Sequence, residues 1–356
     1  MFTILALNPG STSTKIGLFD DETCLKKTVL RHSDQELDGC AAWSSQADFR
    51  RAAVMRFLQE SGINPSALAA LVVRGGLLKP LPAGVYRVDE SMYADLLECK
   101  YGRHASNLGG MIAYSLSCEQ GIAAYTVDPV TVDEFADIAR FSGLQGVPRL
   151  SMSHALNMKA MARQIAAGLG KEYRELNLVV IHLGGGISVS AHRRGRMIDV
   201  NNANCEGPFS MERCGTLPAL ALIDLCYSGR YTRAEMIAQV TSRGGVFSYL
   251  GTRDFQAVEE RVSGGDREAL SVVEAMAYQV GKEVGAMAAV LAGRVDRVVL
   301  TGGMAYSRLL TGLIEQQVAF IAPVEIVPGE EELEALAAGV LRVLRGEEEP
   351  LNYGLL

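Results

Sequence analysis

Apolar and polar positions fall into blocks along this chain, and the first block sets a layout that recurs. Residues 5–20 form an apolar run, a break at Asn8-Pro9-Gly10, four hydroxyl residues with Lys15, and a second apolar run. Residues 178–192 and 298–303 also carry apolar runs that meet a cluster of glycines. Short apolar runs around such a break are typical of strands joined by a turn. The pattern predicts a β-hairpin at the start of the chain and two further strand–glycine-turn segments.

Helix-forming stretches lie between these strands. Thr232 and Glu235 have the spacing of a capping box at the start of one helix. In the C-terminal segment the apolar residues recur on one helical face, with acids in the first turn and arginines near the end. The pattern indicates an α/β fold. The expected helices cover residues 48–60, 92–101, 151–167, 267–291 and 330–345, and short buried strands cover 71–73 and 123–127.

The length of the chain suits two domains rather than one. It has 356 residues, which is long for a single hydrophobic core. Gly143, Gly146 and Pro148 form the best candidate boundary. We therefore predict one domain over residues 1–148 and a second over residues 149–329.

Composition and charge exclude several classes of protein. The net charge is −7 and no long Lys/Arg run is present, which argues against nucleic acid as a partner. The apolar runs are too short for a membrane span. The seven cysteines lack a C-x-x-C pair and zinc spacing, so reduced thiols are expected. A strand that begins almost at Met1 leaves no room for a targeting segment, and we expect a cytoplasmic protein.

The first turn carries unusual chemistry for a hairpin. Asn8, Ser11, Ser13 and Lys15 offer an amide, hydroxyls and an ammonium group, and Gly10 lets backbone N–H groups approach an anion closely. A phosphate chain needs such donors, although an ordinary polar turn also fits.

Several single residues add to this picture. Asp128 follows a strand and precedes a proline, which is a usual place for a functional acid in an α/β sheet. His154 falls at the start of a predicted helix, where N–H groups favour an anion. We expect His32 and His192 to be solvated.

The common nucleotide and hydrolase signatures are missing. No G-x-x-x-x-G-K-[ST] sequence occurs, and the run Gly184-Gly185-Gly186 does not extend to G-x-G-x-x-G. Residues 186–190 end in Ser where a nucleophile elbow needs Gly, and no H-E-x-x-H occurs.

Seven motifs occur in order along the chain, and they begin at Asn8, Arg74, Val127, His154, His182, Gly207 and Pro328. Together they resemble the acetokinase family, and its butyrate-type members in particular, within the acetate and sugar kinase/Hsp70/actin superfamily. The resemblance implies two related actin-like (ribonuclease H-like) α/β domains with a nucleotide cleft between them. It also implies that the C-terminal helix, residues 330–356, packs back on the first domain, and that the chain is a homodimer.

The resemblance implies an enzyme that transfers the γ-phosphoryl group of ATP to butyrate, reversibly, giving ADP and butyryl phosphate, with Mg²⁺ as cofactor. The implied phosphate and nucleoside contacts are Asn8, Ser11, Ser13, Lys15, Gly184, Gly185, Gly186, Arg253, Asp254, Gly302 and Gly303. The implied catalytic residues are Arg74, His104, His154 and Arg213. The implied metal-binding acids are Asp128 and Glu331, with Glu330 or Glu332 as alternatives to Glu331.

Three positions depart from the acetate-type pattern. Gly185 stands where acetate-type members usually have Asn. In acetate-type members, the Arg that stabilises the transition state directly follows a Gly-Thr pair. Here Leu217 follows that pair, so Arg213 is the candidate for this role. Their substrate Arg aligns with Leu71, so Arg74 is the candidate for the acid.

Other functions stay open at this point. The acid could be propionate, isobutyrate or acetate rather than butyrate. From other classes, an actin- or Hsp70-like ATPase would carry a polymer insertion or a peptide domain, and the sequence shows no segment for either. An exopolyphosphatase would need a carboxylate base for water.

Overall fold

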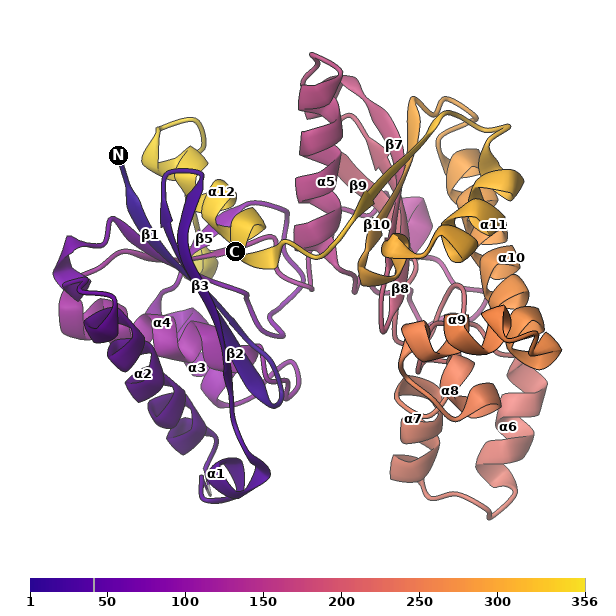
Figure 1. Ribbon diagram of the computed structural model, residues 1–356, viewed down its shortest axis with the longest axis horizontal. Helices are drawn as coiled ribbons and strands as arrows, with labels where there is room; N and C mark the ends of the chain where they lie inside the picture. The colour runs from indigo at the N-terminus through magenta and orange to yellow at the C-terminus, as the bar shows by residue number, and fades with distance from the viewer. Residues whose placement is uncertain (41, 356) are drawn as a thin grey trace. The chain divides into compact units, whose positions relative to one another are not determined.

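A computed structural model describes residues 1–40 and 42–355 of the chain (Figure 1). The chain divides into two compact units. Unit 1 comprises residues 1–132 and 331–356, and unit 2 comprises residues 133–330. Each unit has its own sheet.

Unit 1 is built on a mixed sheet whose strands have the order β12-β5-β6-β4-β1-β2-β3. The predicted hairpin is confirmed, because β1 and β2 pair antiparallel with Asn8 opposite Lys15. The strands are β1 (Thr3–Pro9), β2 (Ser13–Asp20), β3 (Thr23–Arg31), β4 (Ala70–Val73), β5 (Val85–Arg87), β6 (Ala124–Val127) and β12 (Leu351–Asn352).

Three neighbouring strands of this sheet run in the same direction. β4 pairs parallel with both β1 and β6. Their carboxyl ends therefore meet at one edge of the sheet, where ligands bind in open α/β sheets. Asn8, Arg74 and Asp128 lie at or directly after these three ends.

Helices cover both faces of the unit 1 sheet. α4 contacts β1, β4 and β6 and carries α2 and α3 on its outer side, while α12 contacts β1, β2, β4, β5 and β6 (Figure 1). The helices are α1 (Asp34–Asp38), α2 (Trp43–Glu60), α3 (Glu90–Leu97), α4 (Asn107–Gln120) and α12 (Glu332–Leu344). The last helix thus completes a core that the first 132 residues begin.

Unit 2 has a five-stranded sheet with the order β11-β10-β7-β8-β9. β7, β8 and β9 pair antiparallel, whereas β7, β10 and β11 pair parallel. The same sequence of pairings runs from β3 through β2 and β1 to β4 in unit 1. The strands are β7 (Asn177–Leu183), β8 (Ile187–Arg193), β9 (Arg196–Val200), β10 (Arg297–Gly302) and β11 (Val324–Pro328). The two sheets confirm the predicted α/β fold.

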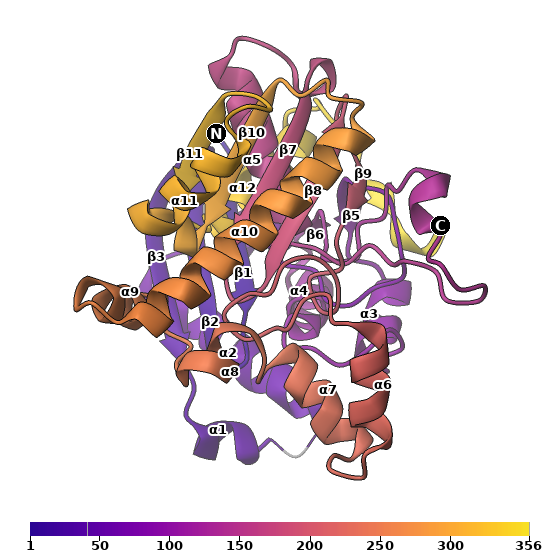
Figure 2. The ribbon, with the colours of Figure 1, turned by 90° about the vertical axis from the view of Figure 1, so that its right-hand side faces the viewer.

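The helices of unit 2 also lie on both faces of their sheet. α5 contacts β7 and β10, and α10 crosses β7, β8 and β9 with α11 beside it (Figure 2). The predicted capping box of Thr232 and Glu235 is confirmed at the start of α7. The helices are α5 (Ala155–Gly168), α6 (Ala219–Tyr227), α7 (Arg233–Thr241), α8 (Gly245–Leu250), α9 (Phe255–Ser263), α10 (Arg267–Val290) and α11 (Arg308–Val318).

The predicted boundary after residue 148 differs from the structure, in which unit 2 begins at Asp133. Ala136 N–H donates to the carbonyl of Ile198 (2.9 Å), and Glu134 accepts from the Met197 amide (2.9 Å). Glu134 also pairs with the buried Lys159 ammonium at 2.7 Å. These contacts attach residues 133–148 to β9 and α5, so the glycines near residue 145 mark a loop of unit 2.

The expectation that His32 and His192 are solvated is wrong. His32 is buried and shares a hydrogen bond with the Thr14 hydroxyl (2.9 Å). His192 is fully buried, with Tyr173 Oη on Nδ1 (2.5 Å) and Ser190 Oγ on Nε2 (2.7 Å). Partners on neighbouring strands and loops compensate for burial of the rings.

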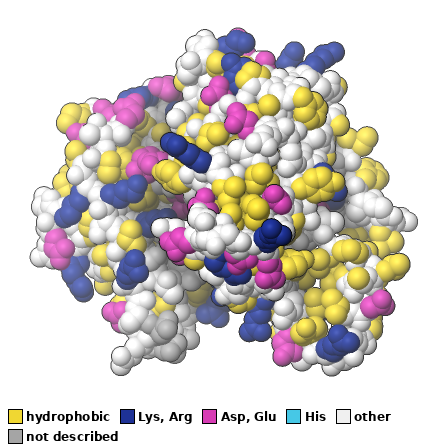
Figure 3. All heavy atoms as spheres, turned by 45° about the vertical axis from the view of Figure 1, so that its right-hand side comes forward, with side chains coloured by type: hydrophobic (Ala, Val, Ile, Leu, Met, Phe, Trp, Pro, Cys, Tyr) yellow, Lys and Arg dark blue, Asp and Glu magenta, His cyan; other side chains and the backbone are white. Residues whose placement is uncertain are grey.

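Within the described residues, no helix combines the length and the apolar character that a membrane span requires. On the face drawn in Figure 3, Lys and Arg side chains are interspersed with Asp and Glu.

The contact between α12 and the sheet predicts the effect of one added methyl group. A Cβ at Gly339 would lie 2.6 Å from Val127 Cγ1, inside β6. We expect Gly339→Ala to lower the free energy of unfolding by about 1–3 kcal/mol, because the core is overpacked. Gly312→Ala in α11 is the control, since a Cβ there meets nothing within 4 Å. Urea unfolding measures both, and an equal effect of the two variants would contradict this packing.

Burial of His192 predicts a pH dependence of stability. Burial, and then the charges of Lys159 and Arg163, hold the pKa of His192 well below its ordinary value of 6.5. Below pH 6.5, His192 therefore binds a proton in the unfolded chain but stays neutral in the folded chain. Stability should fall as pH falls through this range, by about 1.4 kcal/mol per pH unit for one histidine.

Denaturant unfolding between pH 7.5 and 5.5 measures this slope. His192→Gln should flatten the slope, whereas His104→Gln, at an exposed position, should leave it unchanged. An unchanged slope in His192→Gln would contradict the assignment.

Candidate functional site

The predicted site residues fall into two groups, one in each unit. Unit 1 holds Asn8, Ser11, Ser13, Lys15, Arg74, His104, Asp128 and Glu331. Unit 2 holds His154, Gly184, Gly185, Gly186, Arg213, Arg253, Asp254, Gly302 and Gly303.

The first turn joins β1 to β2. Gly10 N–H donates to the Ser13 carbonyl (2.8 Å), which closes a tight turn with Ser11 exposed at its tip. Asn8 is buried at the end of β1, and Lys15 lies opposite it on β2. The amide, hydroxyl and ammonium groups that the sequence predicted to share a site therefore lie on one short hairpin.

Three of the predicted unit 1 residues, namely Asn8, Lys15 and Arg74, contact the same carboxylate. Glu332, in the first turn of α12, pairs with Arg74 Nη1 through Oε1 (2.6 Å). Its Oε2 accepts from the Asn8 amide and lies 3.9 Å from Lys15 Nζ. The side chain of Glu332 is only 12% exposed. Asn8, Lys15 and Arg74 thus converge on a carboxylate, which is the functional group of the acid that the resemblance implies.

Asp128 occupies a constrained position after β6. It is buried, its Oδ1 accepts the N–H of Gly84 (2.8 Å), and its own N–H donates to the Gly84 carbonyl (3.0 Å). Its φ is +39°, in the left-handed region that residues other than glycine seldom adopt. Such conformations cluster at functional sites.

The three consecutive glutamates have different surroundings. Glu330 belongs to unit 2 and lies near His182, whereas Glu332 holds the unit 1 donors. Glu331 is exposed at the N-cap of α12 and its carbonyl accepts the Ala335 amide (2.8 Å). Among the described residues no group of three His, Cys, Asp or Glu has metal-binding spacing. Metal binding by Asp128 and Glu331 stays a prediction.

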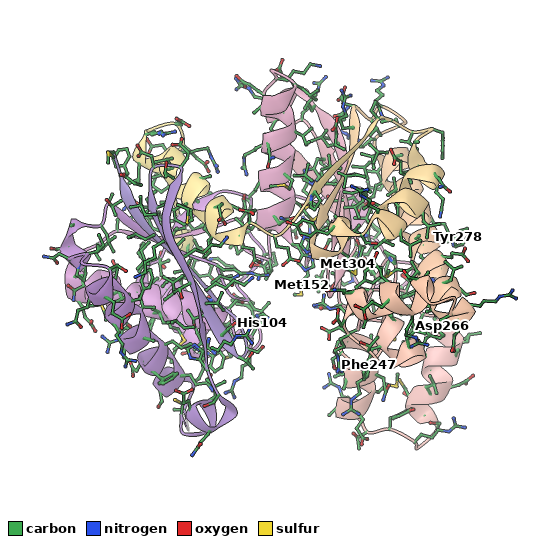
Figure 4. All side chains as sticks on the ribbon, in the orientation of Figure 1. His104, Met152, Phe247, Asp266, Tyr278 and Met304 are labelled. Atoms are coloured by element: carbon green, nitrogen blue, oxygen red, sulfur yellow. The ribbon has the colours of Figure 1, made fainter. Side chains whose placement is uncertain are left out.

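His104 is exposed in the loop before α4 (Figure 4). Its Nδ1 accepts the Ser106 amide (3.2 Å) and lies 2.8 Å from the Ser106 hydroxyl. Its role near a phosphoryl group stays a prediction.

In unit 2, two histidines support the second glycine turn. The rings of His154 and His182 stack with their centroids 3.9 Å apart and 13° between their planes. His154 Nδ1 lies 3.0 Å from Ser188 Oγ, and His182 connects Asn157 Oδ1 (2.9 Å) to Glu330 Oε1 (3.2 Å). His154 is the N-cap residue of α5, so the helix starts later than predicted.

Arg213 packs directly against the second turn. A Cβ at Gly186 would lie 2.4 Å from Arg213 Nη1, so a larger residue there would have to displace the guanidinium group. Arg213 Nη1 donates to the Ala203 carbonyl (3.1 Å), while Nε is buried with no hydrogen-bond partner in the described contacts. Burial lowers the pKa of Arg213. The negative charge of Glu212 partly offsets this shift in pKa, although none of the described ion pairs joins a carboxylate to Arg213.

A cavity of about 620 Å³ opens beside the same turn. This volume is in the range of small-molecule sites. Five predicted residues line it, namely Gly184, Gly185, Arg253, Asp254 and Gly303. Met211, Phe255, Met304 and Tyr306 supply apolar wall (Met304 is labelled in Figure 4).

Residues that line this cavity have further contacts within unit 2. Arg253 stacks on Phe247, with its guanidinium carbon 3.8 Å from the ring centroid, and pairs with Glu212 (3.2 Å). Asp254 caps α9 by accepting the Gln256 amide (2.9 Å). Gly302 has φ +93°, and a Cβ there would lie 2.4 Å from the Leu183 carbonyl, so the end of β10 can approach β7 closely.

Sequence reasoning missed three residues of these sites. Glu332 was only an alternative for the metal, and His182 was noted in a motif without a role, although it directly precedes the glycine run. Arg50, in α2, was not singled out, yet it donates to the first turn. No local pattern marks it, because its partners lie 36–39 residues earlier.

Residues 144–315 match the model of the acetokinase family. This confirms the resemblance over a segment that contains His154, the second glycine turn, Arg213 and the cavity-lining residues up to Ser307. The match does not distinguish butyrate-type from acetate-type members.

Solved structures show the same fold over nearly the whole chain. The acetate kinase of Porphyromonas gingivalis superposes with a TM-score of 0.80 at 19% identity, covering 96% of this chain and 100% of that one. The acetate kinase of Entamoeba histolytica gives 0.75 at 15% identity (96% and 99%), and the propionate kinase of Francisella tularensis 0.74 at 17% (95% and 99%). The fold of this chain is therefore the one seen in these acetate and propionate kinase structures.

The unit 2 cavity predicts that two adjacent glycines respond differently to substitution. At Gly303 a Cβ would meet only Glu330, 3.9 Å away, so Gly303→Leu should fold normally and project into the cavity. We expect its affinity for ADP to fall at least tenfold, about 1.4 kcal/mol. Gly302→Ala should instead lower thermal stability. Calorimetric ADP binding and thermal unfolding separate the effects, and unchanged ADP affinity in a folded Gly303→Leu variant would contradict a nucleotide site here.

Proposed function

We propose that this chain is an ATP-dependent kinase of short-chain carboxylic acids, with butyrate as its preferred acceptor. The observation that carries the proposal is the convergence of Asn8, Lys15 and Arg74 on a carboxylate at the carboxyl edge of the unit 1 sheet. The acetokinase match in unit 2 supports the nucleotide half of the reaction.

The proposed chemistry needs no protein base. A carboxylate oxygen of the acid attacks the γ-phosphorus of ATP, the bond from that phosphorus to the β–γ bridging oxygen breaks, and ADP leaves with the electron pair. The acid is already ionised at neutral pH, so catalysis consists of positioning and charge stabilisation. Arg74 is suited to hold the acid, and Arg213 to stabilise the transferring group. His154 and His104 are further donors in this proposal.

The unit 2 cavity is the proposed site of the nucleoside. Gly302 and Gly303 lie at the end of β10, and Arg253 and Asp254 line the cavity with them. Backbone N–H groups of residues 184–186 and of the first turn are suited to the phosphates. The apolar wall of the cavity fits a base.

The residues of unit 1 fit a magnesium ion carried by the nucleotide. Mg²⁺ keeps several waters and is usually held by one or two carboxylates together with substrate phosphates. Asp128 at the end of β6 supplies a hard oxygen donor, and Glu331 or Glu332 could supply a second. The ion would neutralise phosphate charge during transfer.

The length of the acid is the least constrained part of the proposal. Propionate, isobutyrate and acetate carry the same carboxylate, so Arg74 alone does not select among them. The butyrate-type motifs of the sequence favour a four-carbon acid.

Turnover with a series of acids tests the proposed reaction. With ATP and Mg²⁺, hydroxylamine should trap an acyl phosphate from C2–C6 acids, with the highest kcat/KM at butyrate. ATP loss that is independent of any acid would indicate an ATPase, and polyphosphate hydrolysis would indicate an exopolyphosphatase. Either result without hydroxamate would overturn the proposal.

The position of Arg213 predicts a loss of rate rather than of binding. We expect Arg213→Ala to lower kcat by about 10³–10⁵-fold, as for other arginines at a transferring phosphoryl group, with ADP affinity retained. Arg174→Ala is the control, because that side chain is 77% exposed and pairs only with Glu172 among the described ion pairs. Near-normal kcat in a folded Arg213→Ala variant would refute this role.

A further inference from the structure

Arg50 is buried beneath the first turn. It lies in α2, is 1% exposed, and is among the largest fully buried side chains of the described residues. Its Nη1 donates to the carbonyl of Ser13 (2.8 Å) and to the hydroxyl of Thr14 (3.0 Å). Its Nη2 donates to the carbonyl of Ser11 (2.9 Å). One guanidinium group therefore holds two alternate carbonyls of the turn from the inside.

This arrangement fixes which way the peptide groups of the turn face. A peptide whose carbonyl points to Arg50 must point its N–H in the opposite direction, because the peptide unit is planar and trans. The peptide between Ser11 and Thr12 is held in this way. The Ser13 carbonyl accepts from both Arg50 and the Gly10 amide, and the next residue, Thr14, already pairs with Leu30 of β3. His32 also supports the turn. Its backbone N–H donates to the Thr12 carbonyl (2.9 Å), and its ring Nε2 lies 2.9 Å from Thr14 Oγ1.

In the part of the chain that the structure describes, no acid pairs with the guanidinium group of Arg50. No ion pair joins it to a carboxylate among the described residues, and its Nε is buried without a hydrogen-bond partner. Burying an uncompensated charge is costly. Arg51, the next residue of α2, instead pairs with Asp48 and Glu119 near the surface. Of these two neighbouring arginines, therefore, only the one beneath the turn lacks a carboxylate partner among the described ion pairs.

We propose that Arg50 is a positioning residue that presets the Asn8–Lys15 turn to bind the phosphates of ATP. The inference rests on the proposed function for its ligand. Arg50 orients the turn N–H groups outward before the nucleotide arrives, and its positive charge attracts the phosphates through the turn. The fork of the guanidinium group is essential, because an ammonium group cannot reach both carbonyls in the same planar geometry.

Arg50→Lys separates geometry from charge. It keeps the cation but removes the fork, and we expect a fall of at least tenfold in the affinity for ATP. In turnover, KM for ATP should rise while KM for the acid, which Arg74 contacts in the proposal, stays unchanged. Arg51→Lys is the matched control at the next position of the same helix.

Hydrogen exchange of the ligand-free protein gives a second readout that needs no turnover. Amides of residues 10–14 should exchange faster in Arg50→Lys than in the wild type, with the rest of α2 and the thermal midpoint little changed. If Arg50→Lys does not fold, Thr14→Val serves instead. It deletes the hydroxyl that Arg50 and His32 share while filling a similar buried volume, so the support of the turn is weakened and the charge of Arg50 is kept.

The two readouts distinguish the possible outcomes. Faster exchange at residues 10–14 together with weaker ATP binding supports the inference. Unchanged exchange, or faster exchange with normal ATP affinity, overturns it. If the wild type binds no ATP but exchange still accelerates, the proposed function fails while the support of the turn by Arg50 remains.

Discussion

The fold depends on how two backbone turns satisfy their inward-facing carbonyl groups. In unit 1 the carbonyls of Ser11 and Ser13 accept from Arg50, and in unit 2 the carbonyl of Gly185 accepts from the Ser210 hydroxyl (2.6 Å). Buried carbonyls need such partners. With the carbonyls held from inside, each turn can present N–H groups outward. The two units thus share a strand order, but a different side chain donates to the turn carbonyls in each: Arg50 in unit 1 and Ser210 in unit 2.

Charge is distributed around these turns in a way that suits anions. Arg50 and Arg213 are removed from water, and burial lowers the pKa of each. Among the described ion pairs, Arg74 and Lys15 share Glu332 as their carboxylate partner. At the first turn, Arg50, Arg74 and Lys15 thus face one carboxylate among the described ion pairs, although the whole chain has a net charge of −7. Uncompensated positive charge at turns of donor groups favours phosphates and carboxylates.

Features that depend on residues close together in the sequence could be predicted from the sequence. The hairpin of residues 5–20 and the capping box at Thr232 follow from turn chemistry and periodicity, and both are confirmed. Gly184, Gly185, Arg253, Asp254 and Gly303, which the acetokinase motifs implied as nucleotide contacts, line one cavity. These residues could be named because their motifs are contiguous.

What the sequence could not predict depends on contacts between distant segments. Arg50 is separated from Ser11 by 39 positions, and Asn8 from Glu332 by 324. His192 was expected to be solvated, yet hydrogen bonds with Tyr173 and Ser190 let it be buried. The boundary near residue 148 was misplaced because glycines mark turns, whereas the contacts of Glu134 decide which unit holds the segment.

Direct attack of a carboxylate on ATP can be measured most directly by ³¹P NMR with butyrate labelled with ¹⁸O in its carboxyl group. The proposed reaction predicts an acyl phosphate whose phosphorus resonance carries the isotope shift of one bonded ¹⁸O, in amounts equal to the ADP formed. Unlabelled inorganic phosphate as the only product, with no acyl phosphate at any time, would contradict transfer to the acid.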